Sequence, residues 1–348
     1  MQPLGFASDY MQGAHEAILK KLTEINGTDY PGYGSDAITE SAKNKIRAAC
    51  SAPQAEVYFL VGGTQTNATV IDALLHGYEG VVSADTGHIS VHEAGAIEFG
   101  GHKVLAVPHE NGKLMPQALF DYLKTFYGDD NREHMVQPGM VYISQPTEYG
   151  TLYSKDELTA IRKICDTYGL RLYVDGARLA YALASPENDV TLKDLAALTD
   201  VFYIGGTKCG AMFGEAVVIP KKGSIPHFFT TIKQHGSLLA KGWMLGVQFD
   251  VLFTDDLYLS IGKNAVAYAA RIQKTLEDRG YRMQFHSPTN QIFPVFSDEE
   301  LARISESVAM GFWEKADASH TVMRIATAWY TKAESVDALL ALFGDKQI

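Results

Sequence analysis

Cysteine is scarce in this chain of 348 residues and occurs only at Cys50, Cys165 and Cys209. The three positions are scattered and show none of the spacings that are typical of metal sites, so we expect no bound metal. An odd number of widely separated thiols suits a reducing compartment, where disulfides are rare. We therefore expect a cytoplasmic protein.

Long apolar runs and an excess of positive charge are lacking as well. No run approaches the ~18 apolar residues that a membrane-spanning helix needs, and the N-terminus lacks the charged and apolar regions of a secretory signal. The chain carries 30 Lys and Arg against 41 Asp and Glu, which gives a net charge of −11. Because phosphate binding needs a basic face, we expect no nucleic-acid partner, and we expect no membrane partner either.

The composition that remains is that of an ordinary globular protein, with 46% hydrophobic and 20% charged residues. The length allows two packed units. Between residues 57 and 219, short apolar runs alternate with helical patterns, which predicts an α/β fold with a mostly parallel central sheet and helices on both faces. The expected strands are 57–61, 80–84, 103–107, 140–144, 170–174, 201–204 and 216–220, the last of which can run antiparallel.

The C-terminal part of the chain has a different pattern. From residue 226 onward, long helical patterns at 226–253 and 257–279 are rich in apolar residues. Shorter runs follow, and they predict strands of a smaller α+β unit at 281–285, 291–296 and 322–326.

Two of the expected strands of the large sheet end in turns with distinctive chemistry. The strand 170–174 is followed by Asp175, and the strand 201–204 leads to Thr207 and Lys208. In open α/β sheets, ligands bind just beyond the carboxyl ends of the strands. We therefore expect Asp175 and Lys208 to contact opposite ends of one flat ligand.

Two further turns fall at the same expected edge. Gly62, Gly63 and Thr64 follow a strand and open a helix, where free backbone N–H groups, a hydroxyl and the positive end of the helix dipole favour a phosphate. The alternative is a plain strand-to-helix turn with Thr64 as the N-cap residue. His88 follows the next strand and is either a satisfied structural histidine or a ring that lies against a ligand. Tyr33 lies in a Pro-Gly loop and is either a turn residue without a functional role or an active-site contact.

These turns together offer an anion site, a flat ring, a carboxylate, an amine and, at Arg178, a guanidinium. The combination suits pyridoxal 5′-phosphate, a cofactor that is anionic, planar and bears an aldehyde. Lys208 would form the Schiff base, because the pKa of a lysine falls readily in a desolvated site beside another cation. Asp175 would keep the pyridine nitrogen protonated, and His88 would stack on the ring.

Several motifs form a pattern whose order and spacing are specific. They are Gly-Gly-Thr-Gln-Thr-Asn at 62–67, Ala-Asp-Thr-Gly-His-Ile at 84–89, Glu-Ala-Gly-Ala at 93–96, Val-Asp-Gly-Ala-Arg-Leu at 174–179, Asp200 followed by Thr207-Lys208, and Met-Arg-Ile-Ala-Thr at 323–327. On these motifs the chain resembles the low-specificity L-threonine aldolases, within the aromatic amino acid β-eliminating lyase/threonine aldolase family of fold-type-I pyridoxal phosphate enzymes. The resemblance covers nearly the whole chain.

The resemblance implies an α/β fold of the aspartate aminotransferase-like kind, fold type I. We divide the chain into an N-terminal arm (1–15) that contributes to the active site, a large cofactor-binding domain (16–250) and a small C-terminal domain (251–348).

The resemblance also assigns roles to individual residues. Lys208, Asp175 and His88 match the catalytic residues of the family. Arg178 matches an arginine near the phenolic oxygen of the cofactor and the substrate carboxylate, and Arg324 and Ser8 match other carboxylate contacts. The implied cofactor-binding residues are Gly62, Gly63, Thr64, His88, Asp175, Arg178, Thr207 and Lys208, and the candidate substrate-binding residues are Ser8, Tyr33, Arg178 and Arg324.

The implied reaction is aldol cleavage of a β-hydroxy-L-amino acid, with threonine or allo-threonine giving glycine and acetaldehyde through an aldimine on Lys208 and a quinonoid intermediate. A β-eliminating lyase or racemase on the same scaffold is an alternative, and a catalytically silent protein that binds pyridoxal phosphate is another. The family further implies a homodimer or homotetramer with shared active sites. Two departures leave the substrate open: residues 147–149 replace a loop that carries histidine in many aldolases, and Lys241 is a candidate to replace an arginine near the phosphate.

Overall fold

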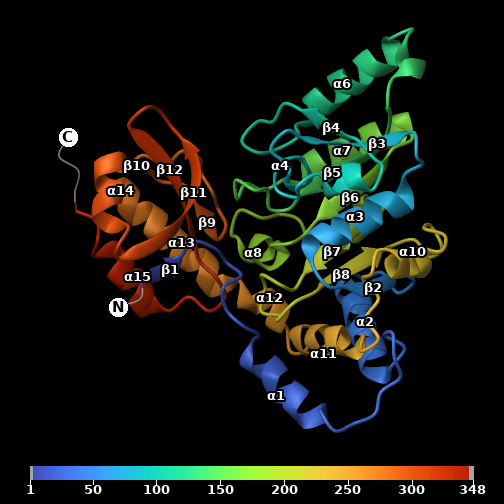
Figure 1. Cartoon of the computed structure of the whole chain (residues 1–348), viewed down its shortest axis with the longest axis horizontal. Coiled ribbons are helices and arrows are strands. Elements are labelled where there is room, and N and C mark those ends of the chain that lie inside the picture. Colours follow the sequence, from blue (N-terminus) through green and yellow to red (C-terminus); the bar gives the residue numbers. More distant parts are fainter. Residues whose placement is uncertain (1–2, 345–348) are drawn as a thin grey trace.

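The computed structural model describes residues 3–344, which are built around two β-sheets (Figure 1). The larger sheet has the strand order β2-β8-β7-β6-β5-β3-β4. β8 runs antiparallel to both of its neighbours, and the other pairs are parallel. Its strands are β2 (Glu56–Leu60), β3 (Glu79–Ala84), β4 (Val104–Val107), β5 (Gln137–Ser144), β6 (Arg171–Asp175), β7 (Val201–Gly205) and β8 (Glu215–Ile219).

The smaller sheet lies in the C-terminal part of the chain, with the order β1-β11-β12-β10 and with β9 paired to β12. β1 comes from the N-terminal arm and pairs in parallel with β11. In Figure 1 this blue strand lies within the red C-terminal lobe, so the N-terminal arm and the C-terminal part of the chain share one sheet. The strands are β1 (Leu4–Phe6), β9 (Gln291–Ile292), β10 (Val295–Ser297), β11 (Val308–Lys315) and β12 (His320–Ala326).

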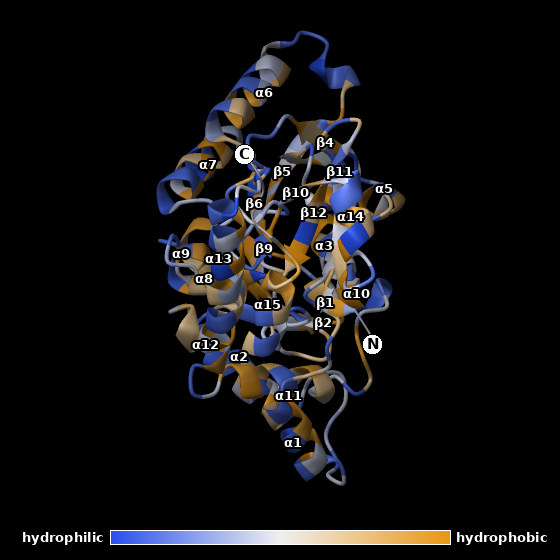
Figure 2. Ribbon diagram, turned by 90° about the vertical axis from the view of Figure 1, so that its left-hand side faces the viewer, coloured by the Kyte–Doolittle hydropathy of each residue, from blue (hydrophilic) through white to orange (hydrophobic). Residues whose placement is uncertain are grey.

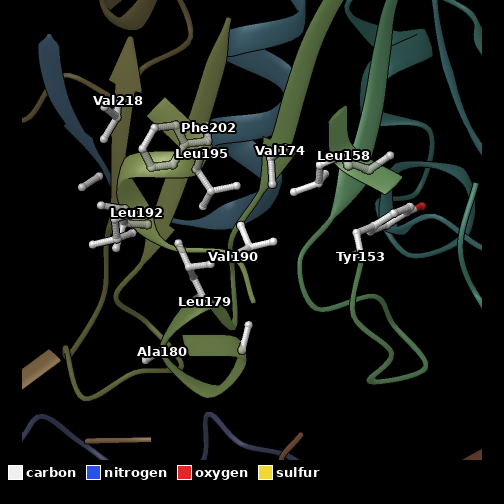
Figure 3. Close-up of a cluster of buried hydrophobic side chains, with 14 of the residues drawn as sticks. Tyr153, Leu158, Val174, Leu179, Ala180, Val190, Leu192, Leu195, Phe202 and Val218 are labelled. Atoms are coloured by element: carbon white, nitrogen blue, oxygen red, sulfur yellow. The ribbon is translucent and has the colours of Figure 1, made fainter. Parts of the chain in front are cut away.

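Helices cover both faces of the larger sheet. Successive side chains along each strand point to opposite faces, so the side chains on both faces are buried. Along β5, Val141 and Ile143 join one core cluster, whereas Met140 and Tyr142 join the other. Figure 3 shows part of the first cluster, where Val174 and Phe202 of the strands lie near Leu195. Helices that contribute to the first cluster include α1 (Glu16–Ile25), α2 (Ala37–Ala49), α6 (Pro116–Gly128), α7 (Lys155–Tyr168), α8 (Leu179–Ala184), α9 (Leu192–Leu198) and α11 (Trp243–Leu252).

The second cluster is covered by α3 (Gly63–Leu74), α4 (His88–Val91), α5 (Ala96–Phe99) and α10 (Phe228–Gln234). Figure 2 shows hydrophilic and hydrophobic residues side by side on outer helices such as α6 and α7, as expected for helices with one buried face. No helix within residues 3–344 is both long enough and apolar enough to cross a membrane. The remaining helices are η1 (Arg132–His134), α12 (Leu257–Ile261), α13 (Lys263–Asp278), α14 (Asp298–Ile304) and α15 (Ala333–Leu340).

The large sheet agrees with the prediction from sequence. The seven expected strands are all present, and the strand expected at 216–220 is β8, which is antiparallel. The helical pattern at 226–253 is divided into α10 and α11 by a turn around Gly236, and the pattern at 257–279 is divided into α12 and α13 at Gly262.

The small sheet was predicted less well. The prediction of a strand at 281–285 is wrong, since this segment forms only one isolated bridge, between Met283 and Pro294. Pro294 has no N–H group to extend the ladder, and it also divides the expected strand 291–296 into β9 and β10. β1 and β11 were not predicted. The division into an arm and two domains stays a prediction.

Candidate active site

Most of the predicted site residues lie at one edge of the larger sheet. β2, β3, β5, β6 and β7 all end at this edge, and β8 begins there because it runs in the opposite direction. The residues that follow these strand ends line a cavity of about 270 Å³. It brings together Gly62, Gly63, Thr64, His88, Asp175, Arg178, Thr207 and Lys208.

Asp175 ends β6 and is almost fully buried, with 4% of its surface exposed. Tyr142 Oη donates a hydrogen bond to Asp175 Oδ2 (2.6 Å), as does Asn67 Nδ2 (3.0 Å), and the N–H of Ala177 donates to Oδ1 (2.9 Å). Burial raises the pKa of this carboxyl, but the electrostatic influence of nearby His88 and the hydrogen bonds outweigh burial, so the pKa of Asp175 is lowered. Asp175 is therefore an anion that suits a protonated ring nitrogen.

His88 begins α4 and is held in place by buried Glu93. His88 Nδ1 lies 2.7 Å from Glu93 Oε1, and the same oxygen accepts a hydrogen bond from Asn67 Nδ2 (2.8 Å). Tyr173 Oη donates to Asn67 Oδ1 (2.8 Å), which fixes the orientation of this amide. Asn67 thus links the carboxylates of Glu93 and Asp175. Because Nδ1 faces Glu93, Nε2 is the ring nitrogen left for proton transfer.

Lys208 follows β7 and is partly buried. Tyr181 Oη donates a hydrogen bond to the Lys208 carbonyl oxygen (2.7 Å), which positions the backbone of the turn. Burial lowers the pKa of Lys208, and the neighbouring positive charge of Arg178 lowers it further. The ammonium group therefore loses its proton more readily than an exposed lysine would, as a nucleophilic amine requires.

The turn at Gly62 and Gly63 has the structure of an anion site. α3 begins at Gly63, and its N-cap residue Gly62 supplies no side-chain hydrogen bond to the first turn. Thr64 lies within that first turn, so the alternative that made Thr64 the N-cap residue is wrong. A side chain at Gly63 would approach Tyr203 Oη to 3.3 Å, so the backbone lies close to the cavity wall. The free N–H groups and the helix dipole at this point fit a phosphate group.

A second cavity of about 380 Å³ adjoins the first and shares several of its residues. Arg178 and Arg324 both line it, together with His88, Glu148 and Lys208. Two guanidinium groups in one cavity suit a carboxylate ligand. Further lining comes from Tyr10, His92, Gln291, Phe312 and Trp313.

Arg324 contacts the N-terminal arm at Ala7, the residue before Ser8. Arg324 Nη2 donates a hydrogen bond to the Ala7 carbonyl oxygen (2.8 Å). Arg324 Nε and Ser8 Oγ are both buried and have no hydrogen-bond partner within residues 3–344. Buried polar atoms without partners are rare in folded proteins, so these two fit a site that a polar ligand completes.

Asp9 was missed in the sequence. It is buried and accepts two hydrogen bonds from Arg178, from Nε to Oδ2 (2.6 Å) and from Nη2 to Oδ1 (3.0 Å), and a third from Asn290 Nδ2 (2.9 Å). Burial raises the pKa of Asp9, yet Arg178 lowers it to about 2 overall. Arg178 therefore shares its donors between Asp9 and any ligand. The available signal was the position of Asp9 next to Ser8, which already placed the arm at the site.

Glu148 was noted only as part of a departing loop. It is buried, and its Oε1 accepts hydrogen bonds from Ser144 Oγ (2.7 Å) and from the N–H of His88 (3.0 Å). It lines both cavities, and burial raises its pKa. The next residue, Tyr149, stacks on Phe285 with ring centroids 4.1 Å apart. In this loop, where the resemblance implies a histidine in many aldolases, this chain has the carboxylate of Glu148.

Tyr33 lies apart from the other site residues of its own chain. It is 47% exposed and lines a different cavity, of about 510 Å³, between α2 and the segment around Leu238. Lys233 Nζ lies 4.6 Å from the centroid of its ring. Lys241, also exposed, does not line either cavity of the site. Neither residue therefore lines the candidate site of its own chain.

The fold and the site together define a class of protein: an α/β protein with a lysine, a buried carboxylate and the N-terminal end of a helix around one cavity. The chain belongs to the beta-eliminating lyase family, whose model matches residues 5–335. It is 32% identical over 297 residues to the low specificity L-threonine aldolase of Pseudomonas aeruginosa, covering 84% of each chain. It also matches the solved structure of Leishmania major threonine aldolase, with 41% identity, a TM-score of 0.94 and 98% of each chain covered.

More distant structures share the fold alone. A putative histidinol-phosphate aminotransferase from Erwinia carotovora atroseptica superposes with a TM-score of 0.72 at 15% identity, over 97% of this chain and 94% of the other. The predicted family, the fold class and the assignment as a lyase that uses pyridoxal phosphate are confirmed. The roles of single residues stay predictions.

Proposed function

We propose that the protein cleaves β-hydroxy-L-amino acids to glycine and an aldehyde, with threonine and allo-threonine as substrates that yield acetaldehyde. The observation that carries this proposal is the arrangement of Lys208 and Asp175 in one cavity that opens onto a pair of arginines, Arg178 and Arg324. The names of the two similar threonine aldolases support the same reaction.

The residues of the first cavity fit pyridoxal phosphate. Lys208 would hold the aldehyde carbon, Asp175 the ring nitrogen, and Gly62, Gly63 and Thr64 the phosphate. When bound, the cofactor supplies an electron sink for the charge left on Cα after the Cα–Cβ bond breaks.

The protein itself orients the substrate and moves a proton. Arg178 and Arg324 bind the substrate carboxylate, and the buried, unpaired Ser8 Oγ and Arg324 Nε supply further donors. His88, held through Nδ1 by Glu93, accepts the β-hydroxyl proton at Nε2. Glu148 lies beside His88 and Arg178 and contributes negative charge to the part of the cavity where the β-substituent lies.

We also propose that two copies of the chain share their active sites. Tyr33 and Lys241 do not line the cavities around Lys208 of the same chain, although they are candidates for contacts with the substrate and the phosphate. A cytoplasmic location is proposed on the three free, buried cysteines.

A product assay tests the reaction. Purified protein loaded with pyridoxal phosphate is incubated with threonine, allo-threonine, phenylserine, serine and tyrosine, and glycine, aldehyde, pyruvate and ammonia are measured. We expect glycine and aldehyde in equal amounts from the β-hydroxy substrates. Pyruvate and ammonia as the main products would instead identify a β-eliminating lyase, and no turnover of any amino acid would identify a silent cofactor-binding protein.

A further inference from the structure

Glu215 is a buried carboxylate in the cofactor cavity to which neither the sequence nor the proposed reaction gives a role. It begins β8, which lies between β2 and β7, and it pairs with Leu60 on one side and Gly205 on the other. Leu60 ends the strand that leads into the Gly62–Thr64 turn. Glu215 therefore lies beside the expected phosphate site, and both line the cavity of about 270 Å³.

The carboxylate accepts two hydrogen bonds from the turn that carries Lys208. The N–H of Gly206 donates to Oε2 (2.9 Å), and Thr207 Oγ1 donates to Oε1 (2.7 Å). Thr207, expected to bind the cofactor, thus directs its hydroxyl proton to Glu215. Within residues 3–344 no cation forms an ion pair with this carboxylate, which is only 3% exposed.

Several other ionisable groups face Glu215. Lys208 stabilises its charged form, whereas Asp175 opposes that form. Further groups close enough to act on it or to be affected by it are Tyr173, Tyr203, Cys209 and Tyr258. Burial outweighs the two hydrogen bonds and Lys208, and it raises the pKa of Glu215 to about 7.

A carboxylate and a phosphate dianion cannot both stay ionised at low cost in one small cavity, because their repulsion is strong where water is excluded. Protonation of Glu215 removes the repulsion. It also keeps oxygen lone pairs for Gly206 and Thr207 and adds one O–H donor. We propose that Glu215 takes up a proton when the phosphate of the cofactor enters the cavity, so that cofactor binding is coupled to proton uptake and weakens as the pH rises. This inference rests on the proposed cofactor site.

The direction of the pH effect follows from linkage. Below the pKa of Glu215 in the free protein the group already carries its proton, so binding needs none. Above that pKa a proton must be taken from solution, and the affinity falls by up to about tenfold per pH unit until the pKa of the bound form is reached. The extra pH dependence should therefore begin near pH 7 and be absent below it.

The experiment measures proton uptake at pH 8. Protein freed of cofactor is titrated with pyridoxal phosphate in a calorimeter, in two buffers with different heats of ionisation. The Glu215→Gln variant is neutral at every pH, so it should take up about one proton fewer than the unchanged protein and bind more tightly at pH 8. Pyridoxal, which has the ring and aldehyde but no phosphate, should give equal proton uptake in the two proteins.

A second measurement needs no variant. Infrared difference spectra of the unchanged protein at pH 8 should gain the carbonyl band of a protonated carboxyl group when pyridoxal phosphate is added. Equal proton uptake in both proteins, or no such band, would overturn the inference while leaving the cofactor site intact. Failure of the unchanged protein to bind pyridoxal phosphate at all would instead overturn the proposed function.

Discussion

At the scale of single residues, the site depends on charges that stay ionised although they are buried. Asp175 does so because Tyr142, Asn67 and the N–H of Ala177 donate to it and because His88 lies nearby. The sequence identified Asp175, Lys208 and His88 because each follows a strand end. It did not identify Asp9 as the partner of Arg178, since 169 residues separate them in the chain and only the folded arm brings them together.

Asp175→Asn should lower kcat for threonine cleavage by at least about 10²-fold, because an amide cannot stabilise the protonated ring nitrogen. Tyr142→Phe is the matched control: it removes one hydrogen bond but leaves the carboxylate, so the loss should be much smaller. Steady-state kinetics with both variants check this. Equal activity of Asp175→Asn and the unchanged protein would contradict the role of Asp175.

Asp9→Asn should lower the free energy of unfolding by about 3–5 kcal/mol, since it leaves the buried guanidinium of Arg178 without a counter-charge. Asp29→Asn, at an exposed position, should change it by no more than about 0.5 kcal/mol. Urea unfolding measures both. The pKa of Asp9 is lowered to about 2, so its contribution is present above the unfolded value of about 4 and is lost as the pH falls from there. A difference that persisted unchanged at pH 2 would contradict this assignment.

At the scale of secondary-structure elements, the site is made where parallel strands end and the chain turns sharply. The strands of the large sheet were predictable because both of their faces are buried and their apolar runs are continuous. β1 was not, because three residues form a strand only through pairing with β11. Glu215 was not identified because the strand was expected to begin one residue later, and its pairing with Leu60 and Gly205 exists only in the folded sheet.

Gly176→Ala tests the closeness of the strand ends. A Cβ atom at Gly176, directly after Asp175, would overlap the carbonyl oxygen of Tyr203 on the neighbouring strand. We expect a loss of about 3 kcal/mol or more in the free energy of unfolding, because two backbone segments must move apart. Gly27→Ala is the control, since a Cβ atom there meets nothing within 4 Å. Thermal and urea unfolding compare the two, and equal stability would show that the strands are not so closely packed.

At the scale of the whole molecule, the site draws on segments from both ends of the chain. Asp9 of the arm, Arg178 at the start of α8 and Asn290 of the C-terminal part form one hydrogen-bonded group. Tyr33 is the exception, because it lies at a separate cavity of the same chain. The sequence predicts Tyr33 as a substrate contact, and under the proposed sharing of sites it makes that contact in a second copy of the chain.

Mixed oligomers test this point. Lys208→Ala and Tyr33→Ala should each be strongly impaired alone, and mixing unfolded chains of both before refolding should restore part of the activity. The reason is that a hybrid dimer with shared sites contains one site in which neither residue is changed. Full activity of Tyr33→Ala alone, or no gain on mixing, would contradict the sharing of sites.

In the proposed function, both the binding of the cofactor and the cleavage depend on Lys208, so Lys208→Ala is the decisive variant. With pyridoxal phosphate added, the unchanged protein should show the long-wavelength absorbance band of a lysine Schiff base and should cleave threonine. Lys222→Ala, which removes an exposed lysine, should show the same band and the same cleavage as the unchanged protein. We expect Lys208→Ala to lack both the band and the cleavage, whereas normal turnover by this variant would show that Lys208 is not the residue that holds the cofactor.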